Sequence, residues 1–393
     1  MDAAAEAALL DSPDAPVIKG VRYGLVDARS PAVQEQLADL YRAVFPHADI
    51  ADSAYVRWQY ADLPTRALVA AGREEKTGDL VASSAMIMLD MRIAGREQPL
   101  WLMLNSSSRP GGPLRVWKED GAMCTPFLKC TRVVAQGAVA RGGPPVVAMP
   151  NDAAEPAYRD HLKYTHIGAL RLHLAPRDPA AMLRAVRGDR WWLRAGAPFA
   201  RFAARTAFRA KRAGAGLEVR PIEAFDERFD AFDEHHAGEH AVVHRRTSAW
   251  LSWRYLSNPL RRYALYAGVR GGELRGAVVL RDDQKGESGG ERIETTVVAD
   301  LIGETSAQGV NDLARTLGGA LRAHVRGSRS TAVLAALPPG CPWEPVLRRN
   351  GLIPGDRLVK RRMPFYAHPA TVGELPRFDS APWTFTLGDL DVI

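Results

Sequence analysis

The sequence has little cysteine and no long apolar run, and both absences narrow the class of protein. Its three cysteines, Cys124, Cys130 and Cys341, are scattered, and none forms a Cys-x-x-Cys pair. This excludes a disulfide framework and favours a reducing compartment. No run of about eighteen apolar residues occurs, so no segment is expected to span a membrane as a helix. The Ala-rich, acidic start lacks the basic region of a signal peptide, which predicts a cytoplasmic protein.

The composition is that of a globular protein with a basic surface. Of the 393 residues, 46% are hydrophobic and 25% are charged, which is enough for two domains that each bury a core. The formal net charge is +7. Such a charge favours anionic partners, namely phosphorylated cofactors, nucleic acid or a membrane surface.

One ten-residue pattern occurs twice. The segments Tyr55–Pro64 and Trp250–Pro259 both read aromatic-x-x-Trp-[Gln/Arg]-Tyr-x-x-x-Pro without a gap, and each is followed by a short apolar run. Two matched Trp-x-Tyr anchors indicate duplication of a whole unit. We therefore expect two halves with one strand order, in which Trp58 and Trp253 occupy equivalent places.

Both units show the same succession of strands and helices. Pairs such as Ser30-Pro31 and Thr125-Pro126 mark helix starts, with a capping side chain followed by proline. The resulting fold class is a layered α/β structure, in which a mixed sheet is flanked by helices. Expected strands are 21–26, 67–71, 80–89, 100–104 and 146–149, then 217–220, 263–269, 276–280, 295–301 and 331–337. Expected domains are 1–180, a basic connecting helix at 181–215, a second copy at 216–366, and a docking tail at 367–393.

The order of these elements and the segment from Val146 to Tyr158, which contains Pro150-Asn151, resemble the GNAT superfamily of acyl-CoA N-acyltransferases, in particular its tandem members. The resemblance covers nearly the whole chain. It implies transfer of an acetyl or other acyl group from acyl-CoA to the amine or hydroxyl of a small-molecule acceptor. It also implies that acyl-CoA enters between two separating strands and that its pyrophosphate lies on a loop before the main helix, where unpaired N–H groups favour anions.

Two stretches approach the pyrophosphate loop of that family. The preferred one is Lys118 to Met123, which includes Gly121 and Ala122 and directly precedes the expected helix. The alternative, Arg109 to Leu114, lies farther from the helix. The resemblance assigns the first stretch to the cofactor.

The resemblance also supplies catalytic candidates. Asn151-x-x-Ala154-x-x-x-Tyr158 has a spacing that recurs in the family, which places Asn151 near the pantetheine arm and makes Tyr158 the proton donor to the leaving thiolate. Tyr164 is an alternative phenol. The base is not given by the resemblance. Asp90 is a candidate from its place on a long strand, and Asn105 is expected to border the substrate and the cofactor at the end of the next strand, together with Ser106 and Ser107, although none of them has a distinctive spacing.

The second unit lacks both the candidate pyrophosphate loop and the Pro-Asn pair. An acidic stretch, 303–309, precedes its helix, and Pro338-Pro339 replaces the Pro-Asn pair, so we expect no acyl-CoA site there. The histidines at 235, 236, 240 and 244 lack the spacing of a zinc-protease motif and have no cysteine nearby, so no metal site is predicted.

Two other functions remain open from the sequence. Tandem GNAT-like domains also occur in Fem-type transferases that use aminoacyl-tRNA. Arg201, Arg205 and Arg209, spaced one helical turn apart, then serve the RNA backbone. The imperfect pyrophosphate loop also permits a binding protein without catalytic activity.

Overall fold

The computed structural model describes residues 8–110, 116–119, 121–141, 143–178, 216–285, 293–325, 328, 330–355 and 363–390. The expected connecting helix at 181–215, with its arginines, lies outside the described residues. Within the described part of the chain, no helix has the length and apolar character needed to cross a membrane.

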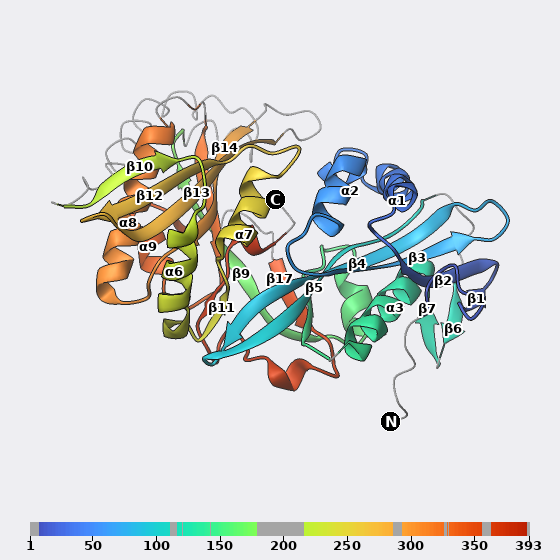
Figure 1. Ribbon diagram of the computed structural model, residues 1–393. Coiled ribbons are helices and arrows are strands. Elements are labelled where there is room, and N and C mark those ends of the chain that lie inside the picture. The colour runs from blue at the N-terminus through green and yellow to red at the C-terminus, as the bar shows by residue number, and fades with distance from the viewer. Residues whose placement is uncertain are drawn as a thin grey trace, which may run out of the picture.

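The first half is a mixed sheet with helices on both faces, as the sequence predicts (Figure 1). The predicted starts at Ser30-Pro31 and Thr125-Pro126 are confirmed, because helices begin at Pro31 and Pro126. In chain order its elements are β1 (Val17–Ile18), β2 (Val21–Val26), α1 (Pro31–Val44), η1 (Asp49–Ala51), α2 (Ser53–Tyr60), β3 (Ala67–Glu74), β4 (Leu80–Ile93), β5 (Arg96–Ser108), β6 (Trp117–Glu119), β7 (Ala122–Cys124), α3 (Pro126–Ala140), β8 (Val146–Ala148), the π-helix η2 (Ala157–His161) and β9 (Thr165–Pro176).

The second half repeats this succession and adds a C-terminal segment. Its elements are β10 (Glu218–Ile222), α6 (Glu227–His236), η3 (Ala237–Glu239), β11 (Val242–His244), α7 (Ser248–Leu251), the π-helix η4 (Ser252–Leu256), β12 (Ala264–Arg270), β13 (Glu273–Lys285), β14 (Ile293–Ile302), α8 (Ala307–Val325), β15 (Ala332–Leu337), α9 (Glu344–Arg349), β16 (Ile353–Pro354), β17 (Met363–Ala367), η5 (Val372–Glu374), β18 (Trp383–Thr384) and η6 (Leu387–Asp389).

The strands of both halves form one continuous sheet whose order is symmetric. It runs β2-β3-β4-β5-β8-β17-β9-β15-β14-β13-β12-β10, so corresponding strands of the two halves lie at equal distances from the centre. The two central strands are exchanged: β17 of the second half pairs with β8, and β9 of the first half pairs with β15. Both therefore cross between the two lobes in Figure 1. The expected duplication is confirmed, but each half completes the sheet of the other.

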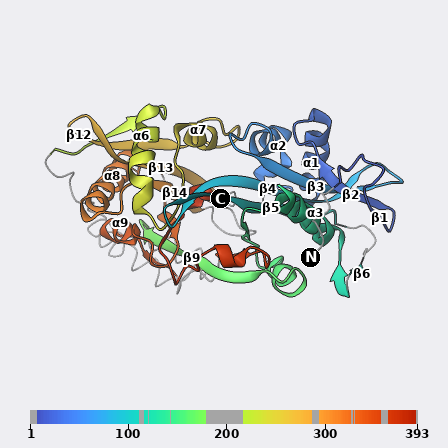
Figure 2. The same ribbon diagram turned by 60° about the horizontal axis from the view of Figure 1, so that its bottom comes forward.

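Helices cover the sheet on opposite faces, and the largest core spans both halves. The even residues Ala82 and Met86 of β4 pack in the cluster that contains α3, whereas the odd residues Ile87 and Leu89 pack in the cluster that contains α1 and α2. The second cluster continues into Trp253 and other aromatic residues of the second half. In Figure 2 the helices of the two halves lie side by side along the shared sheet.

The repeated pattern itself joins the halves. The indoles of Trp58 and Trp253 stack with ring centroids 4.6 Å apart and planes 12° apart. Each indole N–H donates a hydrogen bond of 2.9 Å to the backbone carbonyl of the other tryptophan. Such a reciprocal contact is what a two-fold axis produces in a homodimer, and here it occurs within one chain.

Candidate active site

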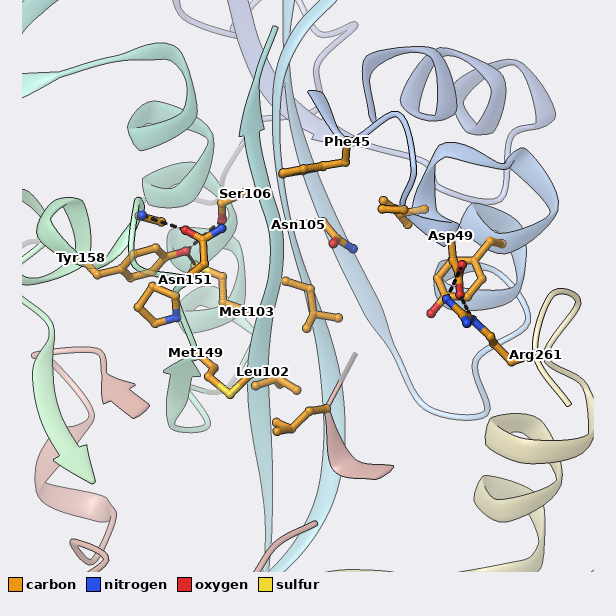
Figure 3. A pocket seen from close by; sticks show the side chains of 17 residues that line it. Phe45, Asp49, Leu102, Met103, Asn105, Ser106, Met149, Asn151, Tyr158 and Arg261 are labelled. Carbon is orange, nitrogen blue, oxygen red and sulfur yellow. Dashed lines mark hydrogen bonds and ion pairs between the residues drawn. The ribbon is translucent and has the colours of Figure 1, made fainter. Parts of the chain in front are cut away.

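A cavity of about 420 Å³ lies where β5 and β8 separate (Figure 3). The two strands pair in parallel only as far as Met103 and Ala148. Beyond Ala148 the chain turns away through Pro150, which has no N–H group to continue a ladder. The lining residues come from β5, from the segment after β8, from the α1–α2 connection and from the second half: Leu102, Met103, Leu104, Asn105, Ser106, Met149, Pro150, Asn151, Ala154, Tyr158, Phe45, Ala48, Asp49, Ile50, Tyr55, Arg261 and Leu390.

A β-bulge in β5 borders the cavity. Two residues of β5, Asn105 and Ser106, face the single residue Ser84 of β4. Asn105 has a φ of 48°, in the left-handed region that asparagine tolerates better than most residues. Its side-chain amide donates to Gln59 Oε1 at 2.9 Å and to the Tyr60 hydroxyl at 2.7 Å. Because Gln59 and Tyr60 belong to the first copy of the repeat, that motif holds the bulge in place.

Tyr158 reaches the same bulge from the π-helix η2. Its hydroxyl lies 2.9 Å from Ser106 Oγ and 2.9 Å from Met103 Sδ, and Ser106 in turn lies 2.8 Å from Ser84 Oγ. The side chain is only 3% exposed, and this burial raises the pKa of Tyr158 to about 12. The phenol is therefore neutral near pH 7 and available as a hydrogen-bond donor. Tyr164 packs edge-on against it at 5.3 Å and does not line the cavity.

Asn151 lies beside Tyr158 on the cavity wall in Figure 3. Its side-chain oxygen accepts a hydrogen bond of 2.9 Å from the N–H of Ala154, and so orders the turn that leads into η2. The spacing noted in the sequence therefore brings Asn151, Ala154 and Tyr158 to one side of the cavity.

The opposite end of the cavity contains an ion pair between the two halves. Arg261 donates from two guanidinium nitrogens to both carboxylate oxygens of Asp49, one of them at 2.8 Å. Burial lowers the pKa of Arg261, but the hydrogen bonds and charge of Asp49 raise it by more. The backbone N–H groups of Leu260 and Arg261 donate to Asn258 Oδ1 at 3.1 Å and 2.9 Å. The Asn258-Pro259 end of the second repeat therefore positions Arg261.

The residues predicted to bind pyrophosphate form a hairpin that does not line the cavity. Lys118 lies on β6, Ala122 and Met123 lie on β7, and Gly121 connects them with a φ of 78°. Lys118 and Met123 are exposed. The hairpin ends directly before α3, whose N-cap residue Thr125 makes no side-chain capping hydrogen bond.

A carboxylate from this hairpin holds two cations of α3. Glu119 forms ion pairs with Lys129 and, at 2.7 Å, with Arg132. Burial raises the pKa of Glu119, but its hydrogen bonds to Lys129, Cys124 and Arg132 lower it by more, so the carboxylate stays ionised. This cluster was not anticipated, because its members are brought together only by the turn between β7 and α3.

The structure does not bring Asp90 to the cavity. It is exposed on β4 opposite Pro99, roughly 13 Å along the strand from Met86, which pairs with the cavity-lining Met103. A general base must lie within hydrogen-bond reach of the proton it removes. The carboxylate that does line the cavity is Asp49, which no sequence spacing marks.

The matching gap in the second half is filled by the chain's own C-terminal segment. Strands β14 and β15 pair in parallel as far as Val297 and Leu334, and η6 contacts both strands. The fit is tight at Gly388, where an added Cβ would lie 1.9 Å from the Tyr255 hydroxyl and 3.1 Å from the carbonyl oxygen of Ala299. Within the described residues, η6 therefore occupies the place between these strands that is open in the first half.

Buried charges hold that segment in place. Arg246 donates to Asp300 at 3.1 Å and to Asp389 at 2.8 Å, and His244 Nδ1 lies 2.8 Å from Asp389. All four residues are 3% exposed or less. Burial raises the pKa of Asp389, but Arg246 and the hydrogen bond with His244 lower it by more. The network therefore contains ionised groups that compensate one another.

Comparison with known proteins bears on the fold. No protein-family model matches the sequence, and no curated protein matches it. Among solved structures, N-myristoyltransferase of Saccharomyces cerevisiae with bound myristoyl-CoA superposes with a TM-score of 0.55 at 12% identity, covering 93% of this chain and 83% of that chain. A GCN5-related N-acetyltransferase from Anabaena variabilis gives 0.56 at 13% identity, covering 88% and 72%.

A tandem GNAT protein from the clavulanic acid biosynthesis pathway is similar along almost its whole length. It superposes with a TM-score of 0.51 at 12% identity, and the match covers 88% of this chain and 98% of that chain. At such low identities the likeness concerns the fold. Together with the symmetric strand order, it shows that this chain has the GNAT fold as two GNAT-like domains in tandem.

Proposed function

We propose that the protein transfers an acyl group from acyl-CoA to an amine, and that the reaction takes place in the cavity of the first half. The observation that carries the proposal is the coincidence of three features at one point: the gap between β5 and β8, the bulge at Asn105 and the buried hydroxyl of Tyr158. A volume of about 420 Å³ lies within the usual range of small-molecule sites.

The gap suits the narrow arm of acyl-CoA. Where two strands separate, their facing N–H and C=O groups lose ladder partners and need others. The amide groups of a pantetheine arm supply such partners, and Asn151 lies beside that path. At the far end of the pantetheine arm, the phosphates of acyl-CoA bind at the start of α3 and at the hairpin that contains Lys118, Gly121, Ala122 and Met123. Lys129 and Arg132 provide two further cations for the phosphates when the phosphates replace Glu119 as their ion-pair partner.

In the reaction a C–N bond forms, the C–S bond breaks, and the amine proton passes to the CoA thiolate directly or through water. An N–H group freed by the bulge at Asn105 or Ser106 donates to the thioester oxygen as charge develops there. Tyr158 donates a hydrogen bond to the leaving sulfur. Tyr158 keeps its proton in the resting site, because burial raises its pKa to about 12.

The second half serves the acceptor rather than a second acyl-CoA. Its slot is filled by η6, while Arg261 and Leu390 extend into the wall of the first-half cavity. A small-molecule amine therefore enters between the Asp49–Arg261 pair and the bulge. Acetyl-CoA and longer acyl-CoA molecules are both candidate donors.

Calorimetry on the full chain tests the proposal. The halves cannot be studied separately, because β9 and β17 are exchanged. We expect one molecule of acyl-CoA per chain with acetyl-CoA or a longer homologue. Ala154→Trp, which fills the cavity, is expected to weaken binding at least about tenfold. Ala307→Trp, an exposed position at the start of α8, is the matched control and should bind like the wild type. Absence of binding by the wild type, or equal binding by Ala154→Trp, would refute the proposal.

A further inference from the structure

Three potential metal ligands converge in the second half, away from the cavity. His236 ends α6, Glu239 lies on η3, and Glu304 precedes α8. Their ligand atoms, one from each side chain, all lie within 4.8 Å of one another. The residues are separated by up to 68 positions in the sequence, so the cluster is a product of the fold and not of a local motif.

The charges in this cluster favour a cation. His236 Nδ1 lies 2.9 Å from Glu239 Oε1, and His236 Nε2 lies 3.4 Å from Glu304 Oε1. Two carboxylates thus approach one imidazole, and the side chains of His236 and Glu304 are each only 12% exposed. Arg275 forms an ion pair of 3.9 Å with Glu304. A divalent ion would offset both negative charges directly.

A second imidazole, which is buried, lies next to the cluster. His240 is 6% exposed, and its Nδ1 has no hydrogen-bond partner among the described residues. It lines a small cavity together with His236 and Gly303, the residue before Glu304. A buried nitrogen without a hydrogen-bond partner lowers the stability of the folded protein unless a ligand or water binds to it.

We propose that His236, Glu239 and Glu304 bind one divalent transition-metal ion of the zinc type, in a site bordered by the buried His240. Two ligands at the usual 2.0–2.2 Å from a tetrahedral zinc ion lie roughly 3.4 Å apart, which is the separation of His236 Nε2 and Glu304 Oε1. Imidazole with carboxylate is a donor set that suits zinc better than calcium or magnesium.

The site connects α6 and η3 to the loop that opens α8. Thr305 N–H already donates to Glu239 Oε2 at 3.4 Å, and the Ser306 hydroxyl donates to Glu304 at 3.0 Å. Bound metal would fix this loop, so its role is to stabilise the second half. None of its three ligands lines the first-half cavity, and the inference does not depend on the proposed function.

Titration of the full-length, EDTA-treated protein with Zn²⁺ in a non-chelating buffer tests the site. We expect one ion per chain and a rise in melting temperature that follows zinc occupancy. His236→Gln and Glu304→Gln are each expected to weaken binding about a hundredfold or more. His47→Gln, an exposed histidine of the first half, is the control and should leave binding unchanged.

Two results would overturn the proposal. One is the absence of zinc binding by the wild type, and the other is binding that persists unchanged in the ligand variants, which would place the ion elsewhere. If a buried variant fails to fold, the exposed Glu239→Gln decides the matter, since that substitution should fold and still weaken zinc binding about tenfold or more.

Discussion

Removal of the Tyr158 hydroxyl is expected to lower the rate of acyl transfer strongly and the free energy of unfolding only slightly. Tyr158→Phe keeps the buried ring, and Ser106 keeps its hydrogen bond to Ser84 at 2.8 Å, so the loss in free energy of unfolding should be about 1 kcal/mol. The hydroxyl is proposed to donate to sulfur only as negative charge develops there. Loss of one such donor typically lowers the rate by about 10²- to 10³-fold, or roughly 3–4 kcal/mol of transition-state stabilisation. Acyl-CoA affinity should change little, because the ground state does not use the bond.

The assay follows release of CoA thiol from a saturating acyl-CoA with the most active amine of a panel, and calorimetry gives acyl-CoA affinity. Tyr164→Phe is the matched control, because the Tyr164 hydroxyl is buried without a partner among the described residues and its ring packs on Tyr158. It should retain the rate. A Tyr158→Phe enzyme with a wild-type rate, under conditions in which chemistry limits turnover, would assign Tyr158 a purely structural role.

Three further predictions concern the bulge and the C-terminal segment. Asn105→Ala should lower the free energy of unfolding by about 1 kcal/mol more than Asn105→Gly in urea titrations, since only alanine is strained at a φ of 48°. Gly388→Ala should destabilise by about 1–3 kcal/mol through its contact with Tyr255, and Tyr255→Phe in the same chain should recover part of that loss, whereas no recovery would locate the clash elsewhere. The pKa of Asp389 is lowered in the folded protein, so its contribution is complete above the ordinary value of about 3.9 and is lost as pH falls through the folded-state pKa. Asp389→Asn should therefore lose less stability between pH 5 and pH 3 than the exposed control Asp379→Asn, and equal losses would contradict this.

The helices and strands could be predicted from the sequence because their signals are local. The Ser-Pro and Thr-Pro pairs marked the starts of α1 and α3, although the side chains of Ser30 and Thr125 make no capping hydrogen bond. Apolar runs marked β4, β5 and their counterparts β13 and β14. Strands β9 and β17 were not predicted as such. Their exchange is a choice of partner across the whole chain, and a pattern of alternating residues specifies which face is buried but not which strand lies alongside.

The residues of the candidate site likewise fall into those that a local sequence pattern reveals and those that only the fold brings together. Asn151 and Tyr158 could be found because both lie in one short segment, the turn after β8 and the π-helix η2, whose spacing resembles that of the GNAT superfamily. Asp49 and Arg261 could not, since each comes from a different half and only the fold brings them together, although Arg261 follows the second repeat directly. Asp90 lies on the expected strand, but its position along β4 places it beyond the cavity, and strand assignment alone does not give that position.

The two copies of the repeat show how one unit keeps an open site while the other closes. The Tyr60 hydroxyl accepts a hydrogen bond from the side-chain amide of the bulge residue Asn105, and Tyr255 donates to Asp300 at 2.8 Å beside the corresponding bulge in β14. The side-chain amide of Asn105 is neutral, so it needs no buried cation beside it, and the cavity can stay open. A carboxylate there requires a buried cation, and Arg246 supplies one only together with Asp389 of the C-terminal segment. The charge at the bulge and the filled slot therefore depend on each other, and we expect a single substitution at Asp300 to leave the slot filled.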